Sequence, residues 1–133
     1  MSIDLPDAIY TLMTSNHSDP FYVSVGGQIA YLRAPEGIKP PICVYNILDD
    51  ASISSFNKDA ISAIVQVDIY CDIRNGLSQA WAINDELFTL LNRKSLTIDG
   101  HPGASIITMD RGKAMEADIN SVRIMSMWIV VAS

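Results

Sequence analysis

Residues 63–93, AIVQVDIYCDIRNGLSQAWAINDELFTLLNR, decide the fold of this chain. From residue 63 to residue 71 every odd position is apolar, whereas the even positions are mixed. Alternation with a period of two, rich in β-branched side chains, predicts a strand with one apolar face. Val65, Val67 and Ile69 are therefore predicted to lie in the core.

A helix is predicted directly after this strand, over residues 76–93. At about 100° per residue its apolar side chains fall on one broad stripe, which suits a helix that covers a sheet. The stripe members assigned to the core are Trp81, Leu87, Phe88 and Leu91. Asn84 is the one polar residue at the centre of the stripe. Because a buried amide without a partner is costly, we expect Asn84 to hydrogen-bond within the core or to a neighbouring strand, in preference to a functional role.

The rest of the chain predicts a small sheet and one further helix. Residues 4–14 have the caps and spacing of a short amphipathic helix. Strands are predicted over residues 28–33, 42–48, 95–99, 104–109 and 121–133, and loops over residues 15–27 (with room for a brief strand), 49–59, 100–103 and 110–120. Most connections are too short for crossover helices. The expected fold is one α+β domain over residues 1–133, an antiparallel or mixed sheet of about four to six strands with two main helices packed on one face.

The amino-acid composition limits the classes of protein to which this chain can belong. With 133 residues, 49% hydrophobic and 18% charged, the chain can bury its own core, and its apolar runs are too short to cross a bilayer. The acidic start lacks the pattern of a signal peptide, which predicts a cytoplasmic protein. The net charge is −6 and the bases are scattered, so no concentrated basic face for nucleic acid is expected.

Candidate reactive side chains are few. Cys43 and Cys71 both fall in predicted strands and are expected to be buried thiols, a disulfide or reactive pair being the alternative. Asp68 and Asp72 share a strand face two pleats apart, which marks a wet or assembly-facing surface more simply than a catalytic pair. His101 precedes a proline in a turn, where a solvated residue is expected. No GxSxG, P-loop, GxGxxG or HExxH motif occurs, so neither an enzyme nor a cofactor or metal is predicted.

The last predicted strand, residues 121–133, is apolar on both faces towards its end. Its even positions include Val122, Ile124, Trp128 and Val130, and its odd positions include Met125, Met127, Ile129 and Val131. One face can lie under the helices. The odd face is expected to meet something else, such as another subunit.

A series of short motifs runs in order through residues 27–91. It comprises APEG at 34–37, PP at 40–41 with VY at 44–45, QVDIY at 66–70, and a helix with Ala80, Ala82, Ile83, Leu87, Leu90 and Leu91. With these motifs the chain resembles the tail-completion or tail-terminator proteins of long-tailed bacteriophages and prophages. After residue 91 only the hydrophobic pattern continues.

The resemblance implies a structural protein of virion assembly. Members of that family are small α+β subunits that assemble, usually as a hexameric ring, on the head-proximal end of the tail tube. The ring stops tube growth and presents a surface to the head connector or neck protein. The implied partners are other copies of the chain, the tail tube protein and the head connector, with no membrane. DNA would pass nearby without specific binding, and the protein would reside in the host cytoplasm during assembly and then in the virion tail or neck.

A ring built from heterologous contacts needs two different patches on each subunit. The odd face of the last strand is the first candidate patch, and the region of residues 49–59, with Phe56 and Lys58, is the second. Asp68 and Asp72 are expected to face the assembly. A neck or head-completion (head–tail connector) protein is the nearest alternative. A protein-binding module unrelated to phages, or a small enzyme that uses Asp68, Asp72 or His101, also stays open.

Overall fold

A computed structural model of the protein describes residues 5–34, 36–49, 61–75, 77–96, 103–118 and 121–132. Three α-helices and one 3-10 helix lie within these residues: α1 (Leu5–Thr14), α2 (Pro20–Ser24), α3 (Leu77–Leu91) and η2 (Ile73–Asn75). The strands are β1 (Ile29–Tyr31), β2 (Ile42–Asp49), β3 (Ile61–Asp72), β4 (Lys94–Ser95), β5 (Ser105–Asp118) and β6 (Ser121–Ala132).

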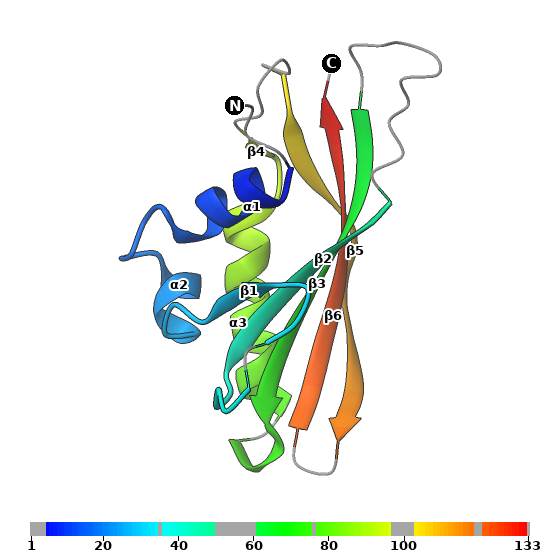
Figure 1. Ribbon diagram of the computed structural model, residues 1–133. Coiled ribbons are helices and arrows are strands. Elements are labelled where there is room, and N and C mark those ends of the chain that lie inside the picture. The colour runs from blue at the N-terminus through cyan, green and yellow to red at the C-terminus, as the bar shows by residue number, and fades with distance from the viewer. Residues whose placement is uncertain are drawn as a thin grey trace.

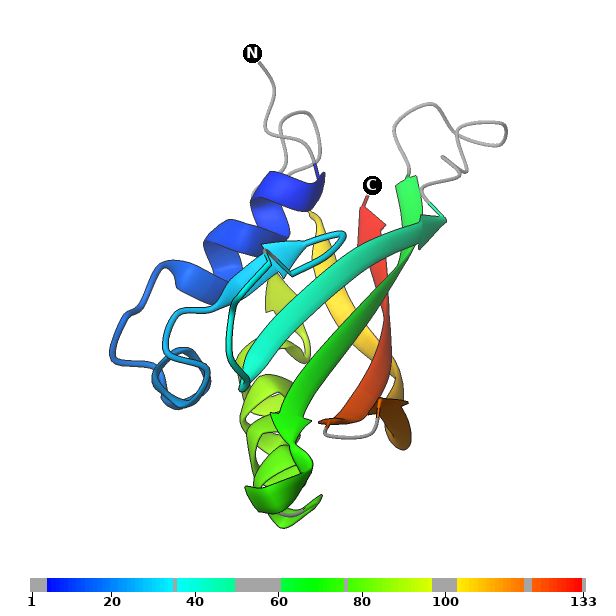
Figure 2. The same ribbon diagram turned by 60° about the horizontal axis from the view of Figure 1, so that its bottom comes forward.

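The strands form one six-stranded mixed sheet in the order β1-β2-β3-β6-β5-β4. Strand β1 runs parallel to β2, and every other pair is antiparallel. The three helices lie on the same side of the sheet (Figure 1). The sheet curls, as the turned view shows (Figure 2). The predicted α+β class, with a mixed sheet and two main helices, α1 and α3, on one face, is confirmed.

The strand–helix unit β3–η2–α3 supplies the centre of the core. Register places Val65 beside Trp128 and Val67 beside Ser126, so the odd face of β3 and the even face of β6 lie on the helix side. The stripe of α3 packs on this surface. Fully buried members are Val65, Val67, Ile69, Leu87, Leu91, Ile124, Trp128 and Val130. Trp81 and Phe88 are only partly buried and pack against the edge of this cluster.

The segment of residues 15–27 contains a helix rather than a loop with a brief strand, so that expectation was wrong. Asp19 is the N-cap of α2, its Oδ2 accepting from the Phe21 N–H at 3.0 Å, and Pro20 begins the first turn. An acceptor at the N-cap followed by proline is a strong helix-start signal. Phe21 is fully buried, which anchors α2, and Ser24 Oγ donates to Glu86 Oε1 of α3 at 2.6 Å.

The predicted loop at residues 110–120 is also wrong, because β5 continues through it to Asp118. The strand pairs with β6 along this stretch, with register shifts between Asp110 and Lys113 and again near Asp118. Such bulges insert unpaired residues and interrupt the alternation of polar and apolar positions. A charged sequence can therefore form a strand here, where several of its side chains are exposed to solvent.

Strand β1 is shorter than the strand predicted over residues 28–33. Within the described residues β1 covers only three residues, and β4 covers only Lys94 and Ser95. The predicted turn at residues 100–103 lies largely outside the described residues, as do residues 97–99 of the predicted strand at 95–99 and residues 50–59 of the predicted loop at 49–59.

Both cysteines are free and fully buried on the helix side of the sheet. Burial raises the pKa of both thiols, that of Cys71 to about 11. A buried thiol with a raised pKa forms little thiolate and is chemically inert. The prediction of buried, unbridged thiols is confirmed.

Candidate assembly surface

The side of the sheet opposite the helices carries a distinct set of residues, which we call the open face. Register aligns Ile64 with Ile129, Gln66 with Met127 and Asp68 with Met125. The open face comprises Ile42, Val44, Asn46, Ile64, Gln66, Asp68, Tyr70, Asp72, Ser105, Ile107, Asp110, Lys113, Met115, Ser121, Arg123, Met125, Met127, Ile129 and Val131. No helix of the described residues packs on it (Figure 1).

One end of the open face is apolar and accessible. Ile64, Ile129 and Ile107 form a row across β3, β6 and β5, because each pairs with the next. Ile107 and the neighbouring Val131 are 37% and 38% exposed, and Met125 and Met127 are half-buried. Contiguous exposed apolar side chains of this kind typically mark an interaction surface. The structure thus brings the odd residues of β6 onto one face that no described helix covers.

Asp68 is not the wet residue that its strand position suggests. The residue is only 3% exposed, with Val44 and Met125 beside it on the neighbouring strands. Gln66 Nε2 donates to Asp68 Oδ2 at 2.9 Å, while Arg123 Nε lies 4.0 Å from Oδ1 without a hydrogen bond. Burial raises the pKa of the Asp68 carboxyl, although Gln66 and Arg123 act in the opposite direction. In the isolated chain Asp68 therefore offers almost no surface for a flat contact.

Asp72 behaves differently although it lies on the same face. Arg74 binds it locally, with Nη2 of Arg74 2.6 Å from Oδ2 and the Arg74 N–H donating to Oδ1 at 2.9 Å. The hydrogen bonds from Arg74 lower the pKa of Asp72 to about 2. Tyr70 stands between the two aspartates on the strand. The structure consequently does not bring Asp68 and Asp72 together as an acid–base pair.

Three further candidate residues cannot be placed relative to the open face. Phe56, Lys58 and His101 lie outside the described residues, so their predicted roles stay predictions. His17 stacks on Tyr22 with ring centroids 4.5 Å apart. Within the described ranges, no group of three or more His, Cys, Asp or Glu side chains is arranged to hold a metal ion.

A feature that the sequence reasoning missed is the way α3 closes the outer edge of β5. Asn84 Nδ2 donates to the Arg111 carbonyl at 2.8 Å, so the expectation that Asn84 bonds to a neighbouring strand is confirmed. Near the end of the helix, Asn92 Oδ1 accepts from the Thr108 N–H at 3.1 Å, and the Arg93 N–H donates to the Ile106 carbonyl at 2.8 Å. The available signal in the sequence was the pair Asn84, within α3, and Asn92, directly after the last residue of α3.

Both outer edges of the sheet have stretches that no described strand borders. Strand β4 pairs only with Ser105 and Ile106 of β5, and β1 pairs with β2 only as far as Tyr45. In the described part of the chain, no strand borders β5 beyond residue 106 or β2 beyond residue 45 on their outer sides. Unpaired strand edges are places where another chain can add.

No helix among the described residues is both long and apolar enough to cross a membrane. No protein-family model matches the chain, and no curated protein matches it either.

Two solved structures are similar in fold. A chain described as "Virion of native gene transfer agent (GTA) particle" aligns with a TM-score of 0.69 and 16% sequence identity, over 96% of this chain and 93% of its own length. A second solved chain aligns with a TM-score of 0.64 and 15% identity, over 97% of this chain and 96% of its own length. At such identities the likeness establishes the fold, along nearly the whole chain.

Proposed function

We propose that this protein is a structural subunit of a phage-type virion, and specifically a tail terminator. In that role it forms a ring on the head-proximal end of the tail tube, stops tube growth and joins the tail to the head connector. The observation that carries the proposal is the fold shared with a chain of a virion particle over nearly the full length of both chains. The motif resemblance at residues 27–91 points independently in the same direction.

The surface supports an assembly role. The apolar end of the open face supplies one patch, centred on Met125, Met127, Ile129 and Val131. The stretches of β5 and β2 that no described strand borders supply candidate sites for a second, different patch, as a ring requires. The patch around Phe56 and Lys58 stays a further candidate. Each subunit then contacts its neighbour through two unlike surfaces. Repeating this contact gives a closed ring when the rotation between neighbouring subunits brings the last one back to the first.

The charge of the chain suits a ring through which DNA passes. Fifteen acidic residues oppose nine basic ones, giving a net charge of −6. Arg74 and Arg111 are each paired with a carboxylate, at 2.6 Å and 3.6 Å respectively. Tight binding of DNA depends on many free cations along one face. A subunit of this charge would let DNA slide past.

The experiment that tests the proposal is polymerisation of the tail-tube protein from the same genome, with and without this protein. Electron microscopy should show shorter tubes of uniform length with extra density at one end. Tubes that grow to unchanged, unlimited lengths with bare ends would count decisively against termination. Binding to isolated head connectors but not to tube ends would favour the neck or head-completion alternative.

A further inference from the structure

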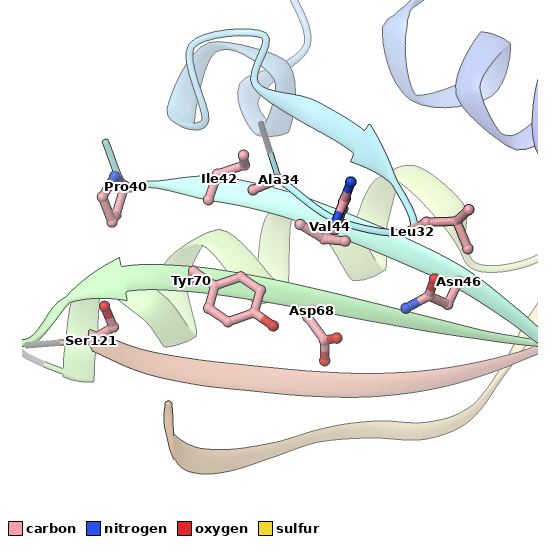
Figure 3. A pocket seen from close by; sticks show the side chains of 10 residues that line it. Leu32, Ala34, Pro40, Ile42, Val44, Asn46, Asp68, Tyr70 and Ser121 are labelled. Atoms are coloured by element: carbon pink, nitrogen blue, oxygen red, sulfur yellow. The ribbon is translucent and has the colours of Figure 1, made fainter. Parts of the chain in front are cut away.

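A cavity of about 270 Å³ lies on the open face, beside the segment that follows β1 (Figure 3). Leu32, Ala34, Pro40, Ile42 and Val44 form its apolar wall. Arg33, Asn46, Asp68, Tyr70 and Ser121 add its polar groups. The close-up shows Tyr70 and Asp68 side by side along β3, with the Tyr70 hydroxyl directed towards Asp68. The cavity therefore combines an aliphatic surface with one carboxylate.

The wall of the cavity is held in place from both sides. The Leu32 N–H donates to the Tyr45 carbonyl at 2.9 Å, and Gln28 Nε2 donates to the carbonyls of Lys39 and Pro41 at 3.0 and 2.8 Å. Leu32 has a φ of 75°, which a leucine rarely adopts, and its side chain is 60% exposed at the rim. Unfavourable backbone angles persist where the surroundings enforce them, and they are frequent at ligand-binding positions.

Asp68 is the group in the cavity that lacks sufficient partners. Its side chain is 4% exposed, yet Oδ1 accepts no hydrogen bond from the described residues. Burial is the main cause that raises the pKa of this carboxyl, so Gln66 and Arg123 do not fully compensate for the loss of water. A buried carboxylate is favourable only when donors surround it.

Among the described residues, Arg123 pairs with Asp68 at 4.0 Å but donates no hydrogen bond to Oδ1. Arg123 directs Nη2 to Met115 Sδ at 3.2 Å, and its Nε has no hydrogen bond to Asp68. Arg33 lines the cavity but its side chain is exposed, so solvent and salt screen its charge. Charge complementarity at the floor of the cavity consequently calls for a donor that arrives from outside.

We propose that this cavity receives a lysine or arginine side chain of a partner protein, with Asp68 Oδ1 accepting from the cationic head and the apolar wall covering the methylene stem. Basic side chains bury their stems along apolar surface while their heads find polar partners. A hydrogen bond between a cation and a carboxylate is stronger than one between neutral groups. The proposal rests on the assembly role only for the source of the residue, a neighbouring chain of the tail.

The test is an NMR titration of the full chain with capped amino acids as probes. N-acetyl-lysine methylamide and N-acetyl-arginine methylamide carry the cation, and N-acetyl-norleucine methylamide has the lysine stem without it. We expect the two basic probes to shift the amide signals of Val44, Asp68 and Tyr70, with weak affinity in the millimolar range, and norleucine to leave them unchanged. Equal shifts with norleucine, or no shifts with any probe, would overturn the proposal.

Two matched variants sharpen the result. Asp68→Asn keeps the shape and should weaken binding of the lysine probe at least about fivefold, because the charge is removed. Asp72→Asn changes a carboxylate on the same strand that Arg74 already occupies, so affinity should be unchanged. A fivefold loss in both variants, or in neither, would contradict a role for Asp68. The comparison between probes uses the natural chain and stands even where Asp68→Asn fails to fold.

The two proposals fail separately. If the chain binds the lysine probe but does not cap tail tubes, the terminator role is refuted and the proposal that the cavity binds a basic side chain stands. If the natural protein and Asp68→Asn both cap tubes normally but the chain does not bind the probe, the proposed role of the cavity is refuted. The terminator role then stands.

Discussion

Asn84 of α3 donates from Nδ2 to the backbone carbonyl of Arg111 on β5, across 2.8 Å and 27 positions of sequence. Arg111 in turn lies over the ring of Phe88, with its Cζ 4.1 Å from the ring centroid. The helix thus holds a strand from its outer edge as well as from the face that it covers. Variants at both ends of this contact should therefore lower the stability of the fold.

Replacing Asn84 by Ala should lower the free energy of unfolding by about 1–3 kcal/mol, because the Arg111 carbonyl loses its buried donor. Urea denaturation followed by circular dichroism measures the change. Ser78→Ala, on the exposed side of the same helix, is the control and should stay within about 0.5 kcal/mol of the natural protein. Equal stability of the two variants would show that the contact contributes nothing.

Gly112→Ala should also destabilise the protein, by about 1–3 kcal/mol. An added Cβ would lie 2.7 Å from Asn84 Nδ2 and 3.1 Å from Trp81 Cζ3, and the Asn84 amide is held by its bond to Arg111. In the double variant with Asn84→Ala the closest clash is gone, so the combined loss should be smaller than the sum of the two single losses. Simple additivity in a double-mutant cycle would argue against this geometry.

The stability of the protein should depend on the ionisation of Asp68. A carboxyl whose pKa is raised by folding stabilises the fold below its unfolded pKa, about 3.9, and this contribution is lost as the pH rises through the folded pKa. Asp68→Asn should therefore gain stability relative to the natural protein as the pH is raised from acid to neutral. Urea unfolding at several pH values measures the difference.

Asp72→Asn provides the opposite case. Arg74 lowers the pKa of Asp72 to about 2, so its contribution is present above the unfolded pKa and is lost as the pH falls towards 2. Any stability deficit of this variant should appear at neutral pH and shrink in acid. A pH-independent difference for Asp68→Asn, or the same sign for both variants, would contradict the electrostatic account.

Substituting Met127 and Ile129 together by Asp should prevent ring formation and tube capping while the chain stays folded. Charged side chains in the centre of an apolar interface are strongly unfavourable. Light scattering and electron microscopy of capped tubes measure assembly, and circular dichroism checks the fold. Val23→Asp, which places one such charge on a 62% exposed position of α2, is the control. Normal capping by the Met127 and Ile129 variant would remove the open face from the interface.

The cysteines should be unreactive in the native protein. Because both thiols are fully buried and their pKa values are raised, a thiol reagent at pH 8 should react at least about 100-fold more slowly than in concentrated urea. A cysteine introduced at the exposed position of Val23 supplies the reference rate. Fast labelling of Cys43 or Cys71 would indicate frequent local opening of the sheet.

Strong periodicity made the centre of the fold predictable. The alternation in β3 and β6 and the stripe of α3 each run long enough that one face must be buried, whatever else the chain does. Helix α2 was not predicted from the sequence because its five residues form little more than one turn, which is too short to show a helical period. The second half of β5 was not predicted to be a strand because bulges at Asp110 and Lys113 interrupt the alternation of polar and apolar residues. An edge strand also tolerates charged side chains.

The candidate surface was predictable only in part. The odd residues of β6 follow from the pattern of one strand, and the structure places them on the open face. The burial of Asp68 does not follow from its own strand, because it depends on Val44 and Met125 from distant segments. Register between strands, and the path of the segment after β1, carry that information.

The hold of α3 on β5 has a consequence for colloidal behaviour. A sheet with a long unpaired edge strand can pair with further copies of itself without limit and form fibres. Natural proteins have features that prevent such growth. Here Asn84, Asn92 and Arg93 engage backbone groups of the border between Ile106 and Arg111, and the bulges kink the remainder of the strand. Another copy of the chain can therefore pair only with short, bent segments of this edge. Such segments suit a closed assembly of few neighbours and disfavour unlimited stacking. The sheet thus carries in its own edge a barrier to runaway polymerisation of the subunit.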